Sequence, residues 1–255
     1  MNIVITGATG GLGAALAQRY AAPGVSLLLL GRDQARLGAT AERARAAGAT
    51  VISEIVDVRD RSYMAEALLR FDERYPVDLL IVNAGVTSGL GPDGVDPASR
   101  RQIEVNLIGA MNTVEPIVPH MVQRGAGRIV LISSLAALRP QPALAAYSAS
   151  KAGLRAWGVA LRGGLKPHGI GVTVVCPGFI TTPMAARHRG AKPLEMSAEN
   201  AARKIVAGIA RRKHSITFPW AMVLLIRFGN LFPPALSDWW ERKFAARIVS
   251  DGEDD

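Results

Sequence analysis

Short apolar strand patterns alternate along the chain with longer helical patterns, and this alternation limits the fold more than any other feature of the sequence. The strand patterns are mostly continuous runs of Leu, Ile and Val, which implies that both faces of each strand are buried. Such alternation is typical of a parallel sheet whose strands are joined by crossover helices. We therefore expect a single-domain, doubly wound α/β fold over residues 1–255, with a parallel seven-stranded sheet and helices on both faces.

The expected elements follow this alternation in order. We predict strands at NIVIT (2–6), SLLLL (26–30), TVISEIV (50–56), VDLLIV (77–82), RIVLI (128–132), VTVVC (172–176) and SITF (215–218). We predict helices near residues 12–22, 33–47, 60–75, 97–123, 147–166 and 197–211. A chain that is 49% hydrophobic and 20% charged can bury a core large enough for this architecture.

Charge, histidine and cysteine usage narrow the classes of function. The net charge of +9 would permit attraction to nucleic acid, anionic lipid or an acidic substrate, but the chain carries no zinc-finger, helix-turn-helix or aromatic RNA-binding motif. The four histidines lack metal-ligand spacing, so we expect neither a nucleic-acid partner nor a metal site. Cys176, the only cysteine, lies in the apolar run GVTVVC and predicts a buried structural thiol. With no secretion signal after Met1, the cytoplasm is the expected location.

A glycine-rich segment, TGATGGLG (6–13), joins the first predicted strand to the first predicted helix. At such a junction Gly7 can form the tight bend, Gly11 can let the backbone approach a pyrophosphate, and Gly13 can allow close helix packing. The N-terminus of the helix then faces the anion. A purely structural turn would also use glycines, but their place at the first strand-to-helix junction favours a dinucleotide site.

The second predicted strand ends in LLLLGRDQ, and this segment bears on the choice of cofactor. An acidic residue here usually binds the ribose hydroxyls of NAD, whereas an Arg pairs with the extra phosphate of NADP. Arg32 therefore favours NADP(H) over NAD(H). Asp33 is the competing candidate, but a negative charge is also favoured in the first turn of a helix, and we interpret Asp33 in that way.

Together these motifs resemble the short-chain dehydrogenase/reductase family, in its shorter-chain group, over about residues 2–185. The resemblance rests on TGATGGLG, VDV, VNAG, EVNLIG, ISS, YSASK and PGFITT, which occur in the family's order. It implies a Rossmann-type fold and a nicotinamide dinucleotide as cofactor. By resemblance, the residues that bind this cofactor, besides Arg32, are Thr6, Gly7, Thr9, Gly11, Leu12, Gly13, Asp57, Val58, Asn83, Ala84, Gly85, Tyr147, Lys151, Pro177, Gly178, Ile180 and Thr182.

The same resemblance implies an oxidoreductase that interconverts a carbonyl and a secondary alcohol, with the catalytic set Asn106, Ser134, Tyr147 and Lys151. Tyr147 and Lys151 are four residues apart, so both side chains lie on one face of a helix. Hydride transfer to a carbonyl leaves negative charge on the oxygen, and Tyr147 is the expected proton donor. We expect the Lys151 ammonium to lower the pKa of Tyr147. By resemblance, Lys151 also reaches the nicotinamide ribose.

The other two members of the set have narrower expected roles. By resemblance, Ser134 hydrogen-bonds the substrate oxygen, and Asn106 holds a water that relays protons toward Lys151. Ser133 competes with Ser134 for the serine role, and Ser134 is preferred because its distance from Tyr147 fits the family. Taken singly, each residue has an ordinary structural explanation. Their joint order behind a cofactor motif favours a catalytic set.

The substrate is less well defined. We expect a lid over the active site at about residues 181–210. From Arg187 to Lys213 there are eight Lys or Arg residues against two Glu. These charges could attract a carboxylate, phosphate or coenzyme-A-like group, or they could form a solvated helix face, and the sequence leaves both open.

An apolar C-terminal segment, about residues 216–248, precedes an acidic, solvated tail at 251–255. Its basic and aromatic residues are compatible with a helix in a membrane interface, and a long-chain keto lipid would then be the leading substrate. Arg227 and several prolines interrupt the segment, so it does not predict a transmembrane span. We prefer the interpretation that SITF is the last strand and that the remaining apolar residues cover the substrate pocket or a subunit contact.

Two classes of function remain. One is the NADP(H)-dependent oxidoreductase, and the other is a catalytically silent regulatory or scaffold protein that binds the cofactor. By resemblance we also expect a homodimer or homotetramer that pairs through the helices at 97–123 and 147–166. The second of these carries small residues that permit close contact, namely Ala152, Gly153, Ala156, Ala160, Gly163 and Gly164. The expected location is the cytoplasm, with peripheral contact at the inner face of a membrane as the alternative.

Overall fold

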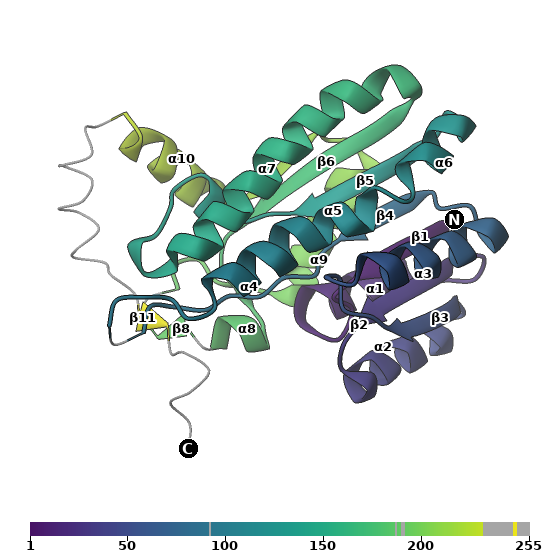
Figure 1. The fold of residues 1–255 in the computed structure, drawn as a ribbon, viewed down its shortest axis with the longest axis horizontal. Coiled ribbons are helices and arrows are strands. Elements are labelled where there is room, and N and C mark those ends of the chain that lie inside the picture. The colour runs from purple at the N-terminus through teal and green to yellow at the C-terminus, as the bar shows by residue number, and fades with distance from the viewer. Residues whose placement is uncertain (92, 187, 190–191, 232–246, 249–255) are drawn as a thin grey trace.

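The computed structural model describes residues 1–91, 93–186, 188–189, 192–231 and 247–248, which form a single large sheet flanked by helices (Figure 1). Within these residues the sheet has seven strands in the order β10-β6-β5-β4-β1-β2-β3, and every pairing is parallel. The strands are β1 (Asn2–Thr6), β2 (Ser26–Gly31), β3 (Thr50–Ile55), β4 (Leu79–Val82), β5 (Gly127–Ile132), β6 (Ile170–Pro177) and β10 (Ser215–Phe218). All seven predicted strands are confirmed.

Helices cover both faces of this sheet because side chains alternate between the faces along each buried strand. Ile3 and Ile5 of β1 pack with α1 (Gly11–Tyr20), α2 (Gln34–Ala46) and α9 (Ala198–Ala210). Val4, between them, packs on the opposite face with α3 (Arg61–Arg74) and α7 (Ala145–Leu165). Each such fully buried aliphatic side chain stabilises the fold by about 1.5–3 kcal/mol. The predicted doubly wound α/β architecture is therefore confirmed.

The chain reverses direction through the sheet between β1 and β4. From β1 it proceeds outward through β2 and β3, and it then crosses back to place β4 on the other side of β1. In a parallel α/β sheet, ligands bind beyond the carboxyl ends of the strands at such a reversal. The topology thus places a site beyond Thr6 and Val82, the last residues of β1 and β4.

The single helix predicted at 97–123 is wrong, because this segment is broken in two places. It forms α4 (Ser99–Ile103), a π-helical turn η1 (Glu104–Ile108), α5 (Gly109–Val114) and α6 (Val118–Arg124). The second break contains Pro116, which has no N–H to continue the helical ladder. The first break contains Asn106, whose side chain is bonded to residues outside the helix. Single π-helical turns of this kind occur frequently at functional sites.

The lid expected at 181–210 is wrong for its second half. Residues 198–210 form α9, which packs against α1 in the core through residues such as Ala201, Ala202 and Ile205. Arg203 and Lys204 lie on its exposed side, as the solvated-face interpretation expects. The first half contains β7 (Ile180–Thr181), paired with β9 (Met196–Ser197), and the short helix α8 (Pro183–Ala186). A second short pair joins β8 (His188–Arg189) to β11 (Arg247–Ile248).

The C-terminal apolar segment begins in β10 and continues as helix α10 (Trp220–Gly229). Met222, Val223 and Ile226 of α10 pack against a cluster formed by Leu135, Val174 and Cys176. Among the described helices, none combines the length and apolarity that crossing a bilayer would require. The predictions for residues 232–246 and for the acidic tail at 251–255 lie outside the described residues.

The described residues also form three short 3-10 helices, namely η2 (Leu135–Ala137), η3 (Pro142–Leu144) and η4 (Lys166–His168). Cys176 is a buried free thiol, as predicted, and burial raises its pKa.

Some of the small residues of α7 serve packing within the chain. A Cβ at Gly153 would lie 3.0 Å from Leu107 of η1, for example.

The packing of α7 on the sheet gives a testable prediction at Gly158. A Cβ there would lie 2.6 Å from Leu131 Cδ1 and 2.8 Å from Val174 Cγ2, whereas a Cβ at Gly163 in the same helix would meet nothing within 4 Å. Both Gly-to-Ala changes gain helix propensity, but only the first crowds the core. We expect Gly158→Ala to have a free energy of unfolding about 1–3 kcal/mol below that of Gly163→Ala in urea titrations. Equal stability of the two variants would contradict this packing.

Candidate active site

The turn between β1 and α1 brings the backbone of two strand ends into close contact. Gly7 has a φ of +67°, and a Cβ at this position would lie 2.8 Å from Ala84 Cα. A Cβ at Gly13 would lie 2.1 Å from the Gly7 carbonyl oxygen, so the first turn of α1 fits against the bend only without a side chain. Gly7 and Gly13 therefore have the roles predicted for them. The first turn of α1 contains no acidic residue, and its N-terminal N–H groups are left for an anion.

Thr6 and Asn83 tie the ends of β1 and β4 together across the reversal point. The Thr6 hydroxyl accepts hydrogen bonds from the backbone N–H groups of Asn83, at 3.0 Å, and Ala84, at 3.1 Å. In return, Asn83 Nδ2 donates to the carbonyl oxygens of Thr6 and Gly7. Thr6 itself is fully buried and does not line the cavity, which corrects its prediction as a cofactor contact. Its hydroxyl instead positions the loop after β4.

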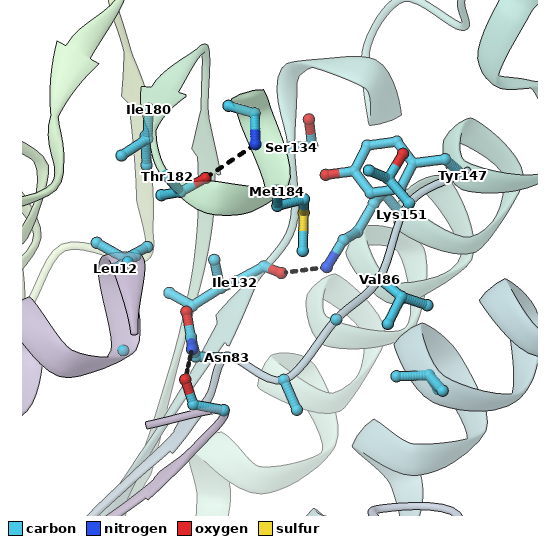
Figure 2. A pocket seen from close by; sticks show the side chains of 18 of the residues that line it. Leu12, Asn83, Val86, Ile132, Ser134, Tyr147, Lys151, Ile180, Thr182 and Met184 are labelled. Atoms are coloured by element: carbon cyan, nitrogen blue, oxygen red, sulfur yellow. Dashed lines mark hydrogen bonds between the residues drawn. The ribbon is translucent and has the colours of Figure 1, made fainter. Parts of the chain in front are cut away.

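A cavity of about 570 Å³ lies beyond these strand ends, and Figure 2 shows side chains from several elements meeting around it. The cavity brings together every predicted site residue except Thr6 and Asn106. These lining residues are Gly7, Thr9, Gly11, Leu12, Gly13, Arg32, Asp57, Val58, Asn83, Ala84, Gly85, Ser134, Tyr147, Lys151, Pro177, Gly178, Ile180 and Thr182.

One end of the cavity is bounded by cations and two acidic side chains that are already engaged. Asp33 caps α2 and accepts a hydrogen bond from the backbone N–H of Arg36 at 2.9 Å, which supports its interpretation as a helix-start residue. Asp57 forms a 2.7 Å ion pair with Arg59, and this hydrogen-bonded guanidinium lowers the pKa of the carboxyl. Arg32 lies 3.9 Å from Asp57 and is half-exposed. Arg32 and Arg36 both line the cavity, and Arg36 was missed by the sequence reasoning.

At the other end, α7 presents Tyr147 and Lys151 to the cavity, as their spacing predicts (Figure 2). Lys151 is buried, and its Nζ donates a 2.9 Å hydrogen bond to the carbonyl oxygen of Ile132 at the end of β5. The same Nζ lies 5.9 Å from the centroid of the Tyr147 ring. Burial disfavours the charged form and lowers the pKa of Lys151 to about 8.

Burial also governs the ionisation of Tyr147, in the direction opposite to our expectation. Loss of contact with water raises the pKa of the Tyr147 hydroxyl, and its hydrogen bond with Ser134 opposes that rise. We expected Lys151 to lower this pKa below its ordinary value. For the chain alone that expectation is wrong, because taking the phenolate out of water is the larger effect.

The two adjacent serines have different partners. Ser133 Oγ donates a 2.8 Å hydrogen bond to the Lys151 carbonyl oxygen in a buried setting, so this hydroxyl is committed to holding α7 against β5. Ser134 lies beside Tyr147 in the cavity wall and caps η2 by accepting a 3.1 Å bond from the Ala136 N–H (Figure 2). This difference favours Ser134 over Ser133 for contact with a substrate.

Asn106 lies behind the cavity wall. Its Oδ1 accepts from the Val86 N–H at 2.7 Å, and its Nδ2 donates to the Val86 carbonyl oxygen and to Ser150 Oγ, each at 2.9 Å. Both side-chain N–H donors of Asn106 are thus used within the protein, and they join the loop after β4 to α7. That Asn106 holds a proton-relaying water stays a prediction. Ser150, its partner, was missed, although it stands within the YSASK motif.

The cavity wall also contains side chains that were not predicted. Leu135, Leu144, Met184 and Met222 are apolar, and Met222 comes from α10, while Ser88, Arg101 and Gln141 are polar or charged. Gln102 lines it as well and donates to Asp96, while its Oε1 has no hydrogen-bond partner among the described residues. Sequence patterns could not reveal these residues, because an apolar run such as WAMVLLI does not show which of its faces meets a cavity.

The cavity fits a nicotinamide dinucleotide at three points. A Cβ at Gly11 would lie 2.8 Å from Thr182 Cγ2, another residue of the cavity wall, so glycine keeps the cavity open here. The N-terminal N–H groups of α1, which no side chain of the described residues caps, suit a pyrophosphate. Lys151 Nζ has three N–H bonds, and Ile132 accounts for one of them. The other two suit the ribose hydroxyls. No group of three or more His, Cys, Asp or Glu residues in the described part of the chain could hold a metal ion.

Comparisons with known proteins agree with this geometry. A family model described as short chain dehydrogenase matches residues 1–193. An uncharacterized oxidoreductase of Myxococcus xanthus is 34% identical over 92% of this chain and 94% of that protein. The ketoacyl reductase HetN of a Nostoc species is 35% identical over 71% of this chain and 63% of that protein.

Two solved structures show the same similarity in three dimensions. A short-chain dehydrogenase from Sphingobium yanoikuyae in complex with NADPH superposes with a TM-score of 0.77 at 28% identity, over 90% of this chain and 94% of that one. A short chain dehydrogenase/reductase from Burkholderia phymatum in complex with NAD gives a TM-score of 0.80 at 27% identity, over 89% and 91%. The two neighbours therefore differ in the cofactor they hold.

The buried Lys151 ammonium predicts an unusual dependence of stability on pH. Its pKa is about 8 in the folded chain and near its ordinary 10.5 when unfolded, so between these values the unfolded chain binds more protons. The contribution of Lys151 to stability should therefore rise with pH across that window and be constant well below pH 8, where the group is protonated in both states. In urea titrations, we expect wild type to gain about 2 kcal/mol relative to Lys151→Met between about pH 7.5 and about pH 9.5. A difference that stays constant with pH would contradict the burial of this charge.

Proposed function

Because the chain belongs to the short-chain dehydrogenase/reductase family, we propose that it interconverts a carbonyl and a secondary alcohol with NADP(H), using Tyr147 as general acid and base. The family, the glycine cradle formed by Gly7, Gly11 and Gly13, and the nicotinamide-bound neighbours together make it an oxidoreductase with a nicotinamide cofactor. The observation that carries the finer proposal is the meeting of Tyr147, Ser134 and Lys151 at the end of a cavity whose other end is that cradle.

Each of these three side chains has a distinct task in the proposed reaction. When bound, the nicotinamide supplies or accepts the hydride at the substrate carbon. Tyr147 donates the proton to the substrate oxygen during reduction and takes it back during oxidation. The Ser134 hydroxyl hydrogen-bonds the same oxygen and stabilises the charge that develops there. Lys151 holds the ribose and places a positive charge near the Tyr147 ring, 5.9 Å from its centroid.

The pKa shifts of Tyr147 and Lys151 indicate which protonation states these two side chains have at neutral pH. Burial raises the pKa of Tyr147, so its hydroxyl is protonated at neutral pH and ready to act as an acid. With a pKa of about 8, Lys151 is largely cationic at that pH. The ammonium then stabilises the phenolate that forms after the proton has left.

The preference for NADP(H) rests on the cations at the other end of the cavity. Arg32 and Arg36 line that end, while the Asp33 carboxylate is engaged at the N-terminus of α2. A 2′-phosphate can form charge-assisted hydrogen bonds with these guanidinium groups, and an Asp33 carboxylate that is already bonded offers less to the ribose hydroxyls of NAD.

For the substrate, we propose a hydrophobic keto compound, with a ketoacyl chain or keto lipid as the leading class. Leu135, Leu144, Met184 and Met222 line the cavity and suit an acyl chain. The relative HetN, by its name a ketoacyl reductase, supports the same class.

We further propose that the chain forms a homodimer or homotetramer through α4, α5 and α7, as pairing in this family suggests. Ala156, Ala160, Gly163 and Gly164 are exposed on α7 and leave its outer surface flat enough for close contact.

A catalytically silent cofactor-binding protein is the alternative function. It would keep the glycine cradle and would not need Tyr147 and Ser134 to share the cavity wall. The arrangement of these two hydroxyls beside Lys151 therefore favours the enzyme.

Substitutions of the hydroxyl groups test the proposed catalytic roles. NADPH oxidation should be followed against a panel of ketones, keto sugars and 3-ketoacyl compounds. With the best substrate, we expect Tyr147→Phe to lower kcat by about 10²–10⁴-fold because the proton donor is lost, and Ser134→Ala to lower it by at least about tenfold. Both variants should still bind NADPH. Ser133→Ala is the matched control, which should lose stability and keep most of its turnover.

Retained turnover in Tyr147→Phe would remove this tyrosine from the mechanism. Wild-type protein that binds NADPH and oxidises it with no member of the panel would favour the silent alternative.

The cofactor preference has its own test at Arg32. We expect the Arg32→Glu substitution to raise the Kd for NADPH by roughly tenfold to hundredfold and to change the Kd for NADH much less, because the lost interaction is with the extra phosphate. Fluorescence titrations of both cofactors measure this. Arg19→Glu makes the same charge change at an exposed position of α1 away from the cavity and should leave both Kd values unchanged. Comparable Kd values for NADPH and NADH in the wild type would contradict the proposal.

A further inference from the structure

The start of helix α10 is fixed to the segment that follows β6. The backbone N–H of Gly178 donates a 2.8 Å hydrogen bond to the carbonyl oxygen of Phe218, two residues before the helix begins. A Cβ at Gly178 would lie 2.9 Å from Pro219 Cδ, so a side chain there would push the two segments apart. Gly178 is also an expected cofactor contact and lines the cavity, so the helix begins beside the cofactor site.

The other end of α10 is fixed to the segment that follows β5. Asn230, the residue after the helix, donates a 3.3 Å hydrogen bond from Nδ2 to the Leu138 carbonyl oxygen, and its Oδ1 accepts a 3.2 Å bond from Arg139. Leu138 and Arg139 follow η2, the short helix whose N-cap is Ser134. Helix α10 therefore spans from the segment after β6 to the segment that begins at the expected catalytic serine.

Between its two ends, one face of α10 packs on a small apolar cluster. Met222, Val223 and Ile226 pack against this cluster, in which Leu135 is the residue directly after Ser134. Among the ten residues of α10, Met222 alone lines the cavity. Leu135 lines it as well. The side chain of Met222 therefore belongs to the same part of the cavity wall as Leu135.

The position of Leu135 shows which end of the cavity this is. Ser134, the preceding residue, lies beside Tyr147, and both hydroxyls are proposed to hold the substrate oxygen (Figure 2). With that oxygen held there, the carbon chain of the substrate extends from the carbonyl carbon past the adjoining wall. Leu135 and Met222 give this wall an apolar surface, which suits a carbon chain.

We propose that Met222 is a specificity-determining residue that limits the length of the substrate's carbon chain on one side of the reacting carbonyl. This inference rests on the proposed function and deepens it. Because α10 is held at both ends, its backbone cannot retreat easily, and a longer chain needs a shorter side chain at position 222. Methionine is unbranched and flexible, so the wild type should accept neighbouring chain lengths and reject much longer ones.

A homologous series of straight-chain 3-ketoesters, lengthened by one methylene at a time at the end remote from the ester, tests this limit. We expect kcat/KM for reduction with NADPH to rise along the series and to fall where the chain reaches Met222. Met222→Ala removes Cγ, Sδ and Cε, so its highest kcat/KM should move to chains about two or three methylenes longer. Met222→Trp extends the wall and should lower kcat/KM at the wild-type optimum by at least about tenfold.

Val223→Ala is the matched control, because Val223 packs on the same cluster and does not line the cavity. It loses apolar contacts, as Met222→Ala does, and should keep the wild-type order of chain lengths. All three variants should bind NADPH with the wild-type Kd, since neither Met222 nor Val223 is an expected cofactor contact. Opposite shifts in the two Met222 variants cannot come from a general loss of stability.

Binding without turnover separates this inference from the proposed function. With NADP⁺ bound, a ketoester cannot be reduced, so calorimetry of this complex gives the Kd of each chain length independently of catalysis, and these Kd values should show the same shifts. Esters that bind with these shifts but are never reduced would support the role of Met222 and contradict the proposed function. An order of chain lengths that is the same in wild type, Met222→Ala and Met222→Trp, or no binding of any ester, would overturn the inference.

Discussion

A buried ammonium group at the carboxyl edge of the sheet is the constraint on which the rest of the site depends. Lys151 is almost fully buried, and the carbonyl oxygen of Ile132 is 2.9 Å from its Nζ. The surrounding backbone must approach this cation closely. A Cβ at Gly85 would lie 3.3 Å from Nζ and 3.2 Å from Asn106 Oδ1, so a side chain there would crowd both. The loop after β4, the end of β5 and helix α7 are therefore fixed relative to one another around a single charge.

The same burial ties proton chemistry to cofactor binding. In the chain alone, loss of water disfavours the charged forms of both Lys151 and Tyr147. A ribose that accepts hydrogen bonds from Nζ would stabilise the ammonium, and the ammonium would in turn stabilise the phenolate. Bound cofactor would thus favour both the Lys151 ammonium and the Tyr147 phenolate. A solvated pair at the same spacing would lack this coupling, because water would screen the two charges.

The sequence predicted those features that local spacing determines. Apolar runs predict the buried strands, and the glycines of TGATGGLG predict the turn. A separation of four residues places Tyr147 and Lys151 on one helical face. Features that depend on distant partners were missed or misjudged. The π-helical turn at Asn106 reflects hydrogen bonds to Val86 and Ser150, and the role of Thr6 reflects bonds to the loop after β4. Similarly, α9 is amphipathic by pattern, and its packing against α1 shows that it belongs to the core and not to a lid.

One side of helix α10 contributes to the cavity wall, and its other side faces outward. A crystal structure of the full chain with bound NADP⁺ would test the arrangement of the cavity more directly than any other measurement. We expect Lys151 Nζ to lie within hydrogen-bond distance of the nicotinamide ribose hydroxyls and the Tyr147 hydroxyl to face the ring across a space large enough for a carbonyl. A Tyr147 side chain turned away from the ring, or a cofactor bound outside the cavity, would contradict it.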